Sequence, residues 1–122
     1  ISFLRPKCDW QTWFRAVGID FNPTHGVRFS QADHAVDAAL AGAGIVLGRR
    51  ALVIKDLSEG RLVAPFKTAI STKAHFRFLC PEGAENRPQV KAFRDWILQE
   101  IEKLSDFNAT LNIIPVEDIA AK

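Results

Sequence analysis

The fold of this chain is decided by the stretch Phe29-Ser-Gln-Ala-Asp-His-Ala-Val-Asp-Ala-Ala-Leu-Ala-Gly-Ala-Gly-Ile-Val-Leu-Gly-Arg-Arg50. It predicts the end of a strand, a capped helix, a glycine turn and a second strand. Ser30 is expected to cap the helix, because Asp33 follows three residues later at the spacing of a capping box. The next apolar residues recur at helical spacing, and they are Ala35, Val36, Ala39, Leu40 and Ala43.

The end of this stretch predicts a helix stop followed by a buried strand of a parallel sheet. Gly42 and Gly44 are expected to end the helix, and the apolar run 45–47 suits a parallel strand that is buried on both faces. A strand that feeds the N-terminus of a helix is a common way to hold a small ligand, often an anion.

The rest of the chain alternates between strand-like and helix-like segments. Further strands are expected at residues 1–5, 27–30, 61–66 and 75–80, and 111–115 is an additional candidate. Further helices are expected after Asp9, over 51–58 and over 88–104, with Gly18 and Gly60 ending the first two and Asn86 as the N-cap of the last. Residues 67–74 are expected to be a polar connection. This order predicts an α/β class with a mostly parallel sheet flanked by helices.

The last helix carries the clearest pattern. Asn86, Pro88 and Gln89 form its expected start. Its apolar residues then make one continuous stripe, formed by Val90, Phe93, Trp96, Ile97, Ile101 and Leu104. A stripe of this size is costly to leave in water, so self-association of the chain is expected.

Composition bounds the class of protein. The 122 residues are 48% hydrophobic and 25% charged, with a net charge of +2, which suits one small domain with a core. The basic residues are scattered rather than gathered into a nucleic-acid-binding stripe. No apolar run reaches the roughly 18 residues of a membrane helix. Residues 1–4 begin as if inside a strand, so the chain is expected to be part of a longer protein.

No constellation of catalytic or metal-binding residues is evident. His25, His34 and His75 share no ligand spacing with each other or with the cysteines, so neither a metal nor another cofactor is expected. No catalytic triad, carboxylate pair or phosphate loop is present, which argues against an enzyme.

The two cysteines, Cys8 and Cys80, are expected to be reduced and unpaired, which fits a cytoplasmic protein. Cys80 precedes a proline at a strand end and is expected to be a buried structural thiol, whereas Cys8 is the more exposed of the two. The alternative is that one of them is a redox-sensing thiol, which requires exposure and a lowered pKa.

Two polar residues are candidates for contact with a ligand. Arg49 ends the expected strand 45–47, where it either pairs with a carboxylate or phosphate or forms a surface salt bridge. His34 lies in the first turns of its helix, where it either faces a cleft or is solvated or packed.

Several segments in order resemble LysR-type transcriptional regulators, in the branch that includes the glycine-cleavage and beta-lactamase regulators. The matching segments are Trp10-x-x-Trp13-Phe14-x-x-x-Gly18, Phe29-Ser30, Ala38-Ala-Leu-Ala-Gly-x-Gly-Ile-Val-Leu-Gly-Arg-Arg50, Asp56-Leu-x-x-Gly-Arg-Leu-Val-x-Pro-Phe66, Leu79-Cys-Pro81 and Arg87-Pro-x-Val-x-Ala-Phe-Arg-Asp-Trp-Ile-Leu98. Each is weak alone, but together they span roughly residues 8–104.

The resemblance implies half of an effector-binding domain like a type 2 periplasmic binding protein. Residues 1–80 would be its second regulatory subdomain, 81–104 a return helix of the first subdomain, and 105–122 a C-terminal tail. By the resemblance, Ser30, Gln31 and Ala32 line an effector cleft, with Phe76 on the crossing strand. Gln31-Ala32 departs from the usual pattern of this branch.

The function implied is sensing of a small effector, for which an anionic group is favoured, or of redox state, in a bacterial transcription factor. DNA would be bound only through a separate N-terminal domain, and the protein would be a homo-oligomer in the cytoplasm. Two alternatives stay open, a solute-binding protein of the same fold and a small enzyme that uses one of the cysteines.

Overall fold

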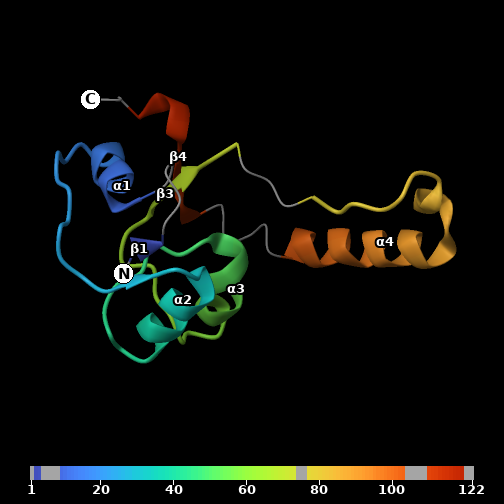
Figure 1. Cartoon of the computed structure of the whole chain (residues 1–122), viewed down its shortest axis with the longest axis horizontal. Helices are drawn as coiled ribbons and strands as arrows, with labels where there is room; N and C mark the ends of the chain where they lie inside the picture. Colours follow the sequence, from blue (N-terminus) through green and yellow to red (C-terminus); the bar gives the residue numbers. More distant parts are fainter. Residues whose placement is uncertain (1, 4–8, 74–76, 104–109, 120–122) are drawn as a thin grey trace. The chain divides into compact units, whose positions relative to one another are not determined.

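The computed structural model describes residues 2–3, 9–73, 77–103 and 110–119. Its elements, in chain order, are β1 (Ser2–Phe3), α1 (Trp10–Ala16), β2 (Arg28–Phe29), α2 (Ala32–Leu40), α3 (Arg50–Ser58), β3 (Thr68–Ser71), η1 (Ala84–Asn86), α4 (Pro88–Lys103), β4 (Asn112–Pro115) and η3 (Val116–Asp118) (Figure 1). The elements labelled η are single turns of 3-10 helix.

The chain divides into two compact units. The first comprises Ile1–Thr72 together with Asn112–Lys122, and the second comprises Lys73–Leu111. The first unit holds the described strands and α1 to α3, and the second holds η1 and α4.

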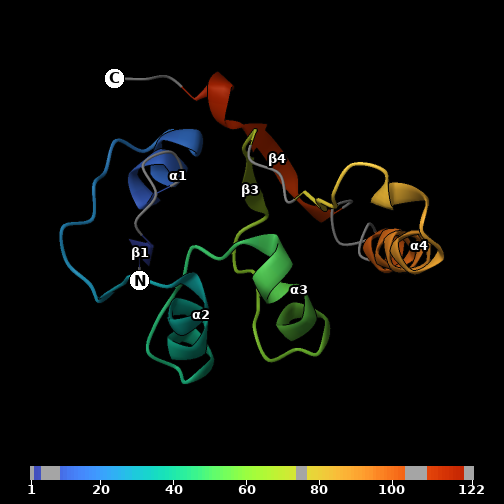
Figure 2. The same cartoon turned by 45° about the vertical axis from the view of Figure 1, so that its right-hand side comes forward.

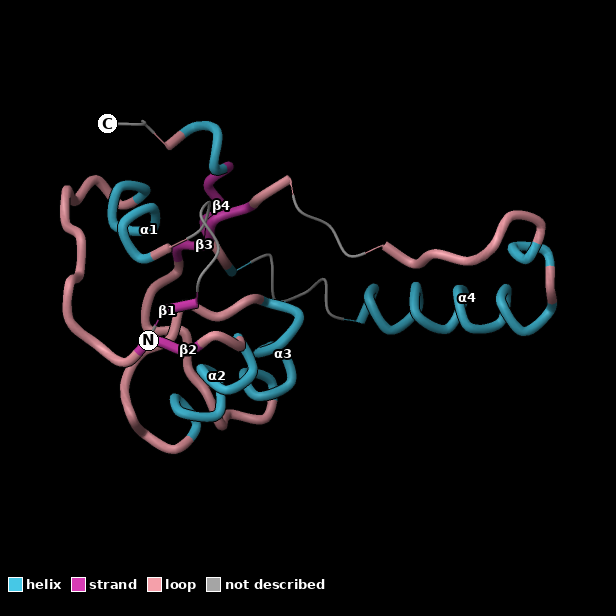
Figure 3. The backbone as a smooth tube through the Cα atoms, in the orientation of Figure 1, coloured by secondary structure: helices cyan, strands magenta, loops and turns pink. Residues whose placement is uncertain are grey.

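Both described sheets are parallel pairs of strands in the first unit. β1 pairs with β2, in the register Phe3 to Phe29, and β3 pairs with β4, in the register Ile70 to Ile114 (Figure 3). Parallel strands joined through helices confirm the predicted α/β class. β4 also confirms a strand within the predicted segment 111–115.

Helices α2 and α3 form much of the small core of the first unit. Ala35 and Val36 of α2 and Val53 and Ile54 of α3 are buried, each at most 8% exposed. The two helices lie side by side (Figure 2), and α2 also packs against β1 and β2. In each helix the two buried residues are neighbours in sequence and belong to the apolar face.

Helix α1 confirms its predicted start and end. The Asp9 carboxylate accepts a hydrogen bond from the Thr12 N–H at 2.8 Å, and Gly18 follows the helix with a left-handed φ of 81°. The indole N–H of Trp13 donates to the carbonyl of Thr68 in β3 at 3.2 Å. The Trp13 ring lies 5.3 Å from that of Phe66, so aromatic packing attaches α1 to the second sheet.

The predicted strand over 45–47 is wrong. Helix α2 ends in a Schellman motif, in which the Ala43 N–H donates to the Ala38 carbonyl at 2.9 Å and Gly42 adopts a φ of 80°. The run that follows belongs to neither described sheet, and Ile45 is 57% exposed. A strand buried on both faces needs a neighbour on each side, and the described sheets pair other segments.

The predicted strand over 61–66 is also wrong. A strand occurs instead within residues 67–74, which were predicted to be a polar connection. The Arg61 and Leu62 N–H groups donate to the carbonyl of Asp56, which ties this segment back to the end of α3. The N–H groups of residues 61 and 62 therefore bond to the C-terminus of α3 and not to a neighbouring strand. The strand begins instead at Thr68.

Two predictions concern the second unit. Residues 77–80 are not in a strand, and the remainder of the predicted strand 75–80 lies outside the described residues. Pro88 is the first residue of α4, as predicted, but Asn86 ends η1 and is not the cap. The Arg87 carbonyl accepts from the Lys91 N–H at 3.0 Å, so Arg87 takes the cap position.

Candidate functional site

Four of the six residues predicted to contact an effector lie at the start of α2. The segment that leaves β2 passes through Ser30 and Gln31, and α2 begins at Ala32. Ser30, Gln31 and His34 are exposed and Ala32 is half-buried. These four residues therefore form one accessible turn, which we call the α2 entrance.

Backbone N–H groups give the α2 entrance its electrostatic character. The N–H groups of Ala32 and Asp33 lie in the first turn of α2 and have no acceptor inside the helix. With the helix dipole they favour a negative group nearby. Asp33 supplies one such group itself, and its carboxylate accepts from the His34 N–H at 3.0 Å.

Ser30 does not cap α2, contrary to the capping-box prediction. The N-cap is Gln31, whose backbone is extended at φ −114° and ψ 137°, and no side chain bonds to the helix start from that position. With the helix beginning at Ala32, Ser30 is one residue too early to reach the first free N–H groups in the usual way.

Arg49 does not end a strand, also contrary to expectation. It is the exposed residue that precedes α3, with an extended backbone at φ −80° and ψ 132°. The preceding residue, Gly48, lies so close to α3 that a Cβ there would stand 2.8 Å from Val53 Cγ1. Glycine therefore permits the close approach through which the chain enters α3 at Arg49.

Three predicted site residues remain, and they are Phe76, Cys8 and Cys80. Phe76 and Cys8 lie outside the described residues. Cys80 is a free thiol and is exposed, so the prediction of a buried structural cysteine is wrong. It is followed by a 3-10 turn rather than by the core of a sheet, which leaves its side chain uncovered.

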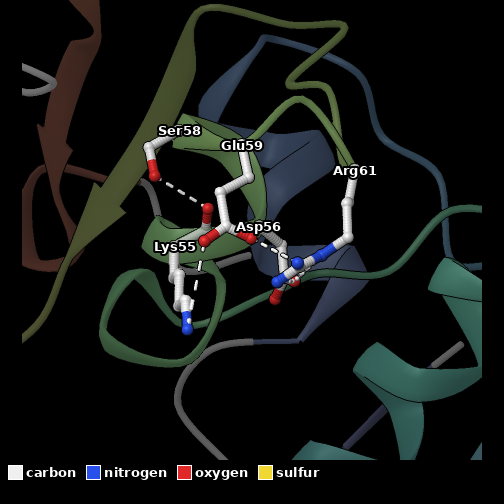
Figure 4. A network of polar contacts seen from close by, with 5 residues as sticks. All are labelled: Lys55, Asp56, Ser58, Glu59 and Arg61. Atoms are coloured by element: carbon white, nitrogen blue, oxygen red, sulfur yellow. Dashed lines mark hydrogen bonds and ion pairs between the residues drawn. The ribbon is translucent and has the colours of Figure 1, made fainter.

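Sequence reasoning missed a cluster of charged side chains at the end of α3 (Figure 4). The Arg61 Nε donates to Asp56 Oδ1 at 2.8 Å, and the same guanidinium pairs with Glu59. The hydrogen bond that Arg61 donates to Asp56 raises the pKa of Arg61 above its usual value; desolvation opposes this shift, and the charge of Glu59 adds to it. Lys55 extends the cluster to Glu59 at 3.9 Å.

This cluster holds the residues that follow α3 against the C-terminus of the helix, and it is not a second site. Asp56 is 9% exposed, and its main chain and side chain both bond to residues just beyond the helix. The only hint in the sequence is an acid near the end of a helix, followed by a glycine and a basic residue.

The described residues contain no cluster of three or more metal-ligating side chains. In the same part of the chain, no helix is both long and apolar enough to cross a membrane.

Comparison with known proteins gives the family. The family model of the LysR substrate binding domain matches residues 6–102. The chain therefore belongs to the LysR substrate-binding domain family. This family consists of regulator domains rather than enzymes, in agreement with the prediction that the chain is not an enzyme.

Individual relatives are transcriptional regulators. The glycine cleavage system transcriptional activator of Escherichia coli strain K12 is 33% identical over 91 residues, which cover 74% of this chain and 30% of that protein. The regulator DsdC of the same strain is 30% identical over 98 residues, covering 80% of this chain and 31% of DsdC. The activator AmpR of Pseudomonas aeruginosa strain PAO1 is 27% identical over 93 residues, which cover 75% of this chain and 31% of AmpR.

The chain thus spans about 30% of the length of these regulators. No solved structure matches it significantly.

Proposed function

We propose that the chain is the effector-sensing part of a bacterial LysR-type transcription factor. The observation that carries the proposal is the family match over residues 6–102. Residues 1–80 act as the second regulatory subdomain, 81–104 as the return helix of the first, and 105–122 as the tail. DNA is bound by a separate N-terminal domain, in the cytoplasm, and the sensor region reports the state of its ligand to that domain.

We propose further that the effector binds at the α2 entrance. The free N–H groups of Ala32 and Asp33 suit a carboxylate or another small anion. Ser30, Gln31 and His34 are exposed beside them and can supply side-chain hydrogen bonds. Phe76 would supply an apolar contact and Arg49 a second positive group, in the arrangement that the resemblance implies.

A redox signal is the second candidate, and the exposure of Cys80 favours it. An exposed thiol is open to oxidation, but sensing also requires a stabilised thiolate. Replacement of Cys80 by Ser tests this candidate, because it leaves effector binding intact and removes the response of this thiol to peroxide.

The effector proposal is tested by the thermal stability of the chain in a panel of amino acids and C2–C6 dicarboxylic acids. A compound at 100 times its Kd stabilises the folded state by about 2.7 kcal/mol, which raises the Tm by several degrees. A panel with no compound that raises the Tm would contradict the proposal.

A charge variant locates the binding. Q31E adds a negative charge beside the free N–H groups and is expected to weaken binding of an anionic effector by about fivefold, since two like charges 4 Å apart in water repel by roughly 1 kcal/mol. Q99E adds the same charge to an exposed position of α4 and is expected to have no effect. Equal weakening by both variants would place the effector elsewhere.

A further inference from the structure

A segment beyond the matched family domain has a defined place in the fold. The family model ends at residue 102, whereas β4 lies at Asn112–Pro115. The chain leaves the first unit after Thr72, forms the second unit, and re-enters the first unit at Asn112. We call residues 110–119, which contain β4 and η3, the β4 segment.

Strand β4 covers one edge of β3. The two strands lie side by side and parallel, in the register Thr68 to Asn112 (Figure 2). The Asn112 N–H donates to the Lys67 carbonyl at 2.6 Å. Among the residues that the structure describes, β3 has no other strand partner. The β4 segment therefore pairs with an edge that no described strand of the matched domain covers.

The opposite edge of β3 holds helix α1. Successive carbonyl groups of a strand point to its two sides in turn, so the Thr68 carbonyl points away from β4 when the Lys67 carbonyl points toward it. The Thr68 carbonyl accepts a hydrogen bond from the indole N–H of the buried Trp13 at 3.2 Å. Strand β3 is therefore bonded to α1 on one side and to β4 on the other.

The sequence of β4 suits this pairing. Since N–H groups also alternate, those of Asn112 and Ile114 face β3, and those at positions 113 and 115 face away from it. Pro115, which has no N–H, stands at a position where the ladder needs none. Ile113 and Ile114 are β-branched, as strands favour.

The pair of β3 and β4 also brings together the two ends of the second unit. That unit begins after Thr72 and ends before Asn112. Ser71 and Asn112 stand three pairs apart on neighbouring strands, so their Cα atoms are about 11 Å apart for a rise of roughly 3.3 Å per residue and a strand spacing of roughly 4.8 Å. Helix α4 belongs to the long crossover that two parallel strands require.

We propose that the β4 segment is a strap. By pairing with β3 it attaches the second unit to the first unit at both of its ends, and it supports the attachment of α1 through Trp13. When the pairing is broken, the second unit is attached only through the connection that follows Thr72. The strap limits the independent movement of the second unit. This role does not depend on the binding of an effector at the α2 entrance.

A matched pair of proline variants tests the pairing. N112P removes the N–H that bonds to Lys67, whereas I113P removes an N–H that points away from β3. Both side chains are exposed, so neither variant removes a buried side chain. In N112P the amide hydrogens of Ala69 and Ser71 and the indole hydrogen of Trp13 are expected to exchange with solvent about tenfold faster or more. In I113P they are expected to stay within about twofold. No change in N112P, or equal changes in both variants, would overturn the proposal.

The attachment of the second unit is tested by ¹⁵N relaxation of the same two variants. The correlation time of the α4 amides is expected to shorten in N112P and not in I113P, because a unit attached at one end tumbles more freely. A chain that ends at residue 109 is a second variant and is expected to behave as N112P does. Faster exchange in β3 without a change in the tumbling of α4 would reduce β4 to a structural strand and overturn the strap.

Discussion

At the scale of single residues, Gly48 leaves no room for a side chain. A methyl group there would lie 2.8 Å from Val53 Cγ1, and Val53 is buried in the contact region of α3. G48A is therefore expected to lower the free energy of unfolding by about 1–3 kcal/mol, the usual cost of overpacking. Urea unfolding monitored by circular dichroism measures it.

The control is the same substitution in a V53A background. V53A alone destabilises the chain because it leaves a cavity, but it also removes the methyl group that G48A meets. In this background G48A should lower the free energy of unfolding by less than it does in the original chain, so the two substitutions are not additive. Strictly additive effects would show that the contact between these residues is not the cause.

A second residue-scale prediction concerns Asp56. D56N keeps the size of the side chain and removes the charge that Arg61 pairs with, and Asp56 is buried, so the urea midpoint should fall. The matched control is D95N, because the Arg94–Asp95 pair is exposed, at 50% and 58% of the two side chains. D95N should leave the midpoint unchanged, and equal shifts from both would contradict the role of burial.

At this scale the sequence predicted which residues lie at the α2 entrance, but not how they are bonded. The capping role of Ser30 depends on where α2 begins, and it is lost because the N-cap is Gln31, one residue later than predicted. The ion pair of Asp56 and Arg61 joins side chains five residues apart around a helix end, a geometry that periodicity does not predict.

At the scale of elements, α1 depends on its cap. Asp9 accepts hydrogen bonds from both the N–H and the hydroxyl of Thr12, at 2.8 and 2.7 Å. D9A should cost about 1 kcal/mol of unfolding free energy, as the loss of an N-cap does. D20A, at an exposed position between α1 and β2, is the control and should be neutral. Equal costs for the two variants would contradict the capping role.

Helices were predicted from the sequence more successfully than strands. Capping residues and terminal glycines lie within or beside the helices they bound, so α1 and α3 were expected close to where they occur. A strand depends on a distant partner. β3 pairs with β4 across about forty residues, whereas the apolar run 45–47 belongs to neither described sheet.

At the scale of the whole molecule, we propose a regulator domain that senses a small molecule at the start of α2. The family is shown by the match over residues 6–102. The position of the site rests on the N–H groups of Ala32 and Asp33, which have no acceptor inside the helix, and on the resemblance. A measurement that resolves individual backbone amides therefore tests the claim directly.

That measurement is a two-dimensional ¹H–¹⁵N NMR titration of the chain with the panel compound that raises its Tm most. The amide signals of Ala32, Asp33 and His34 are expected to move most, while those of α4 stay in place, and Q31E is expected to suppress the movement. Signals that move mainly in α4 or around Asp56, with the α2 entrance unchanged, would contradict the proposed site.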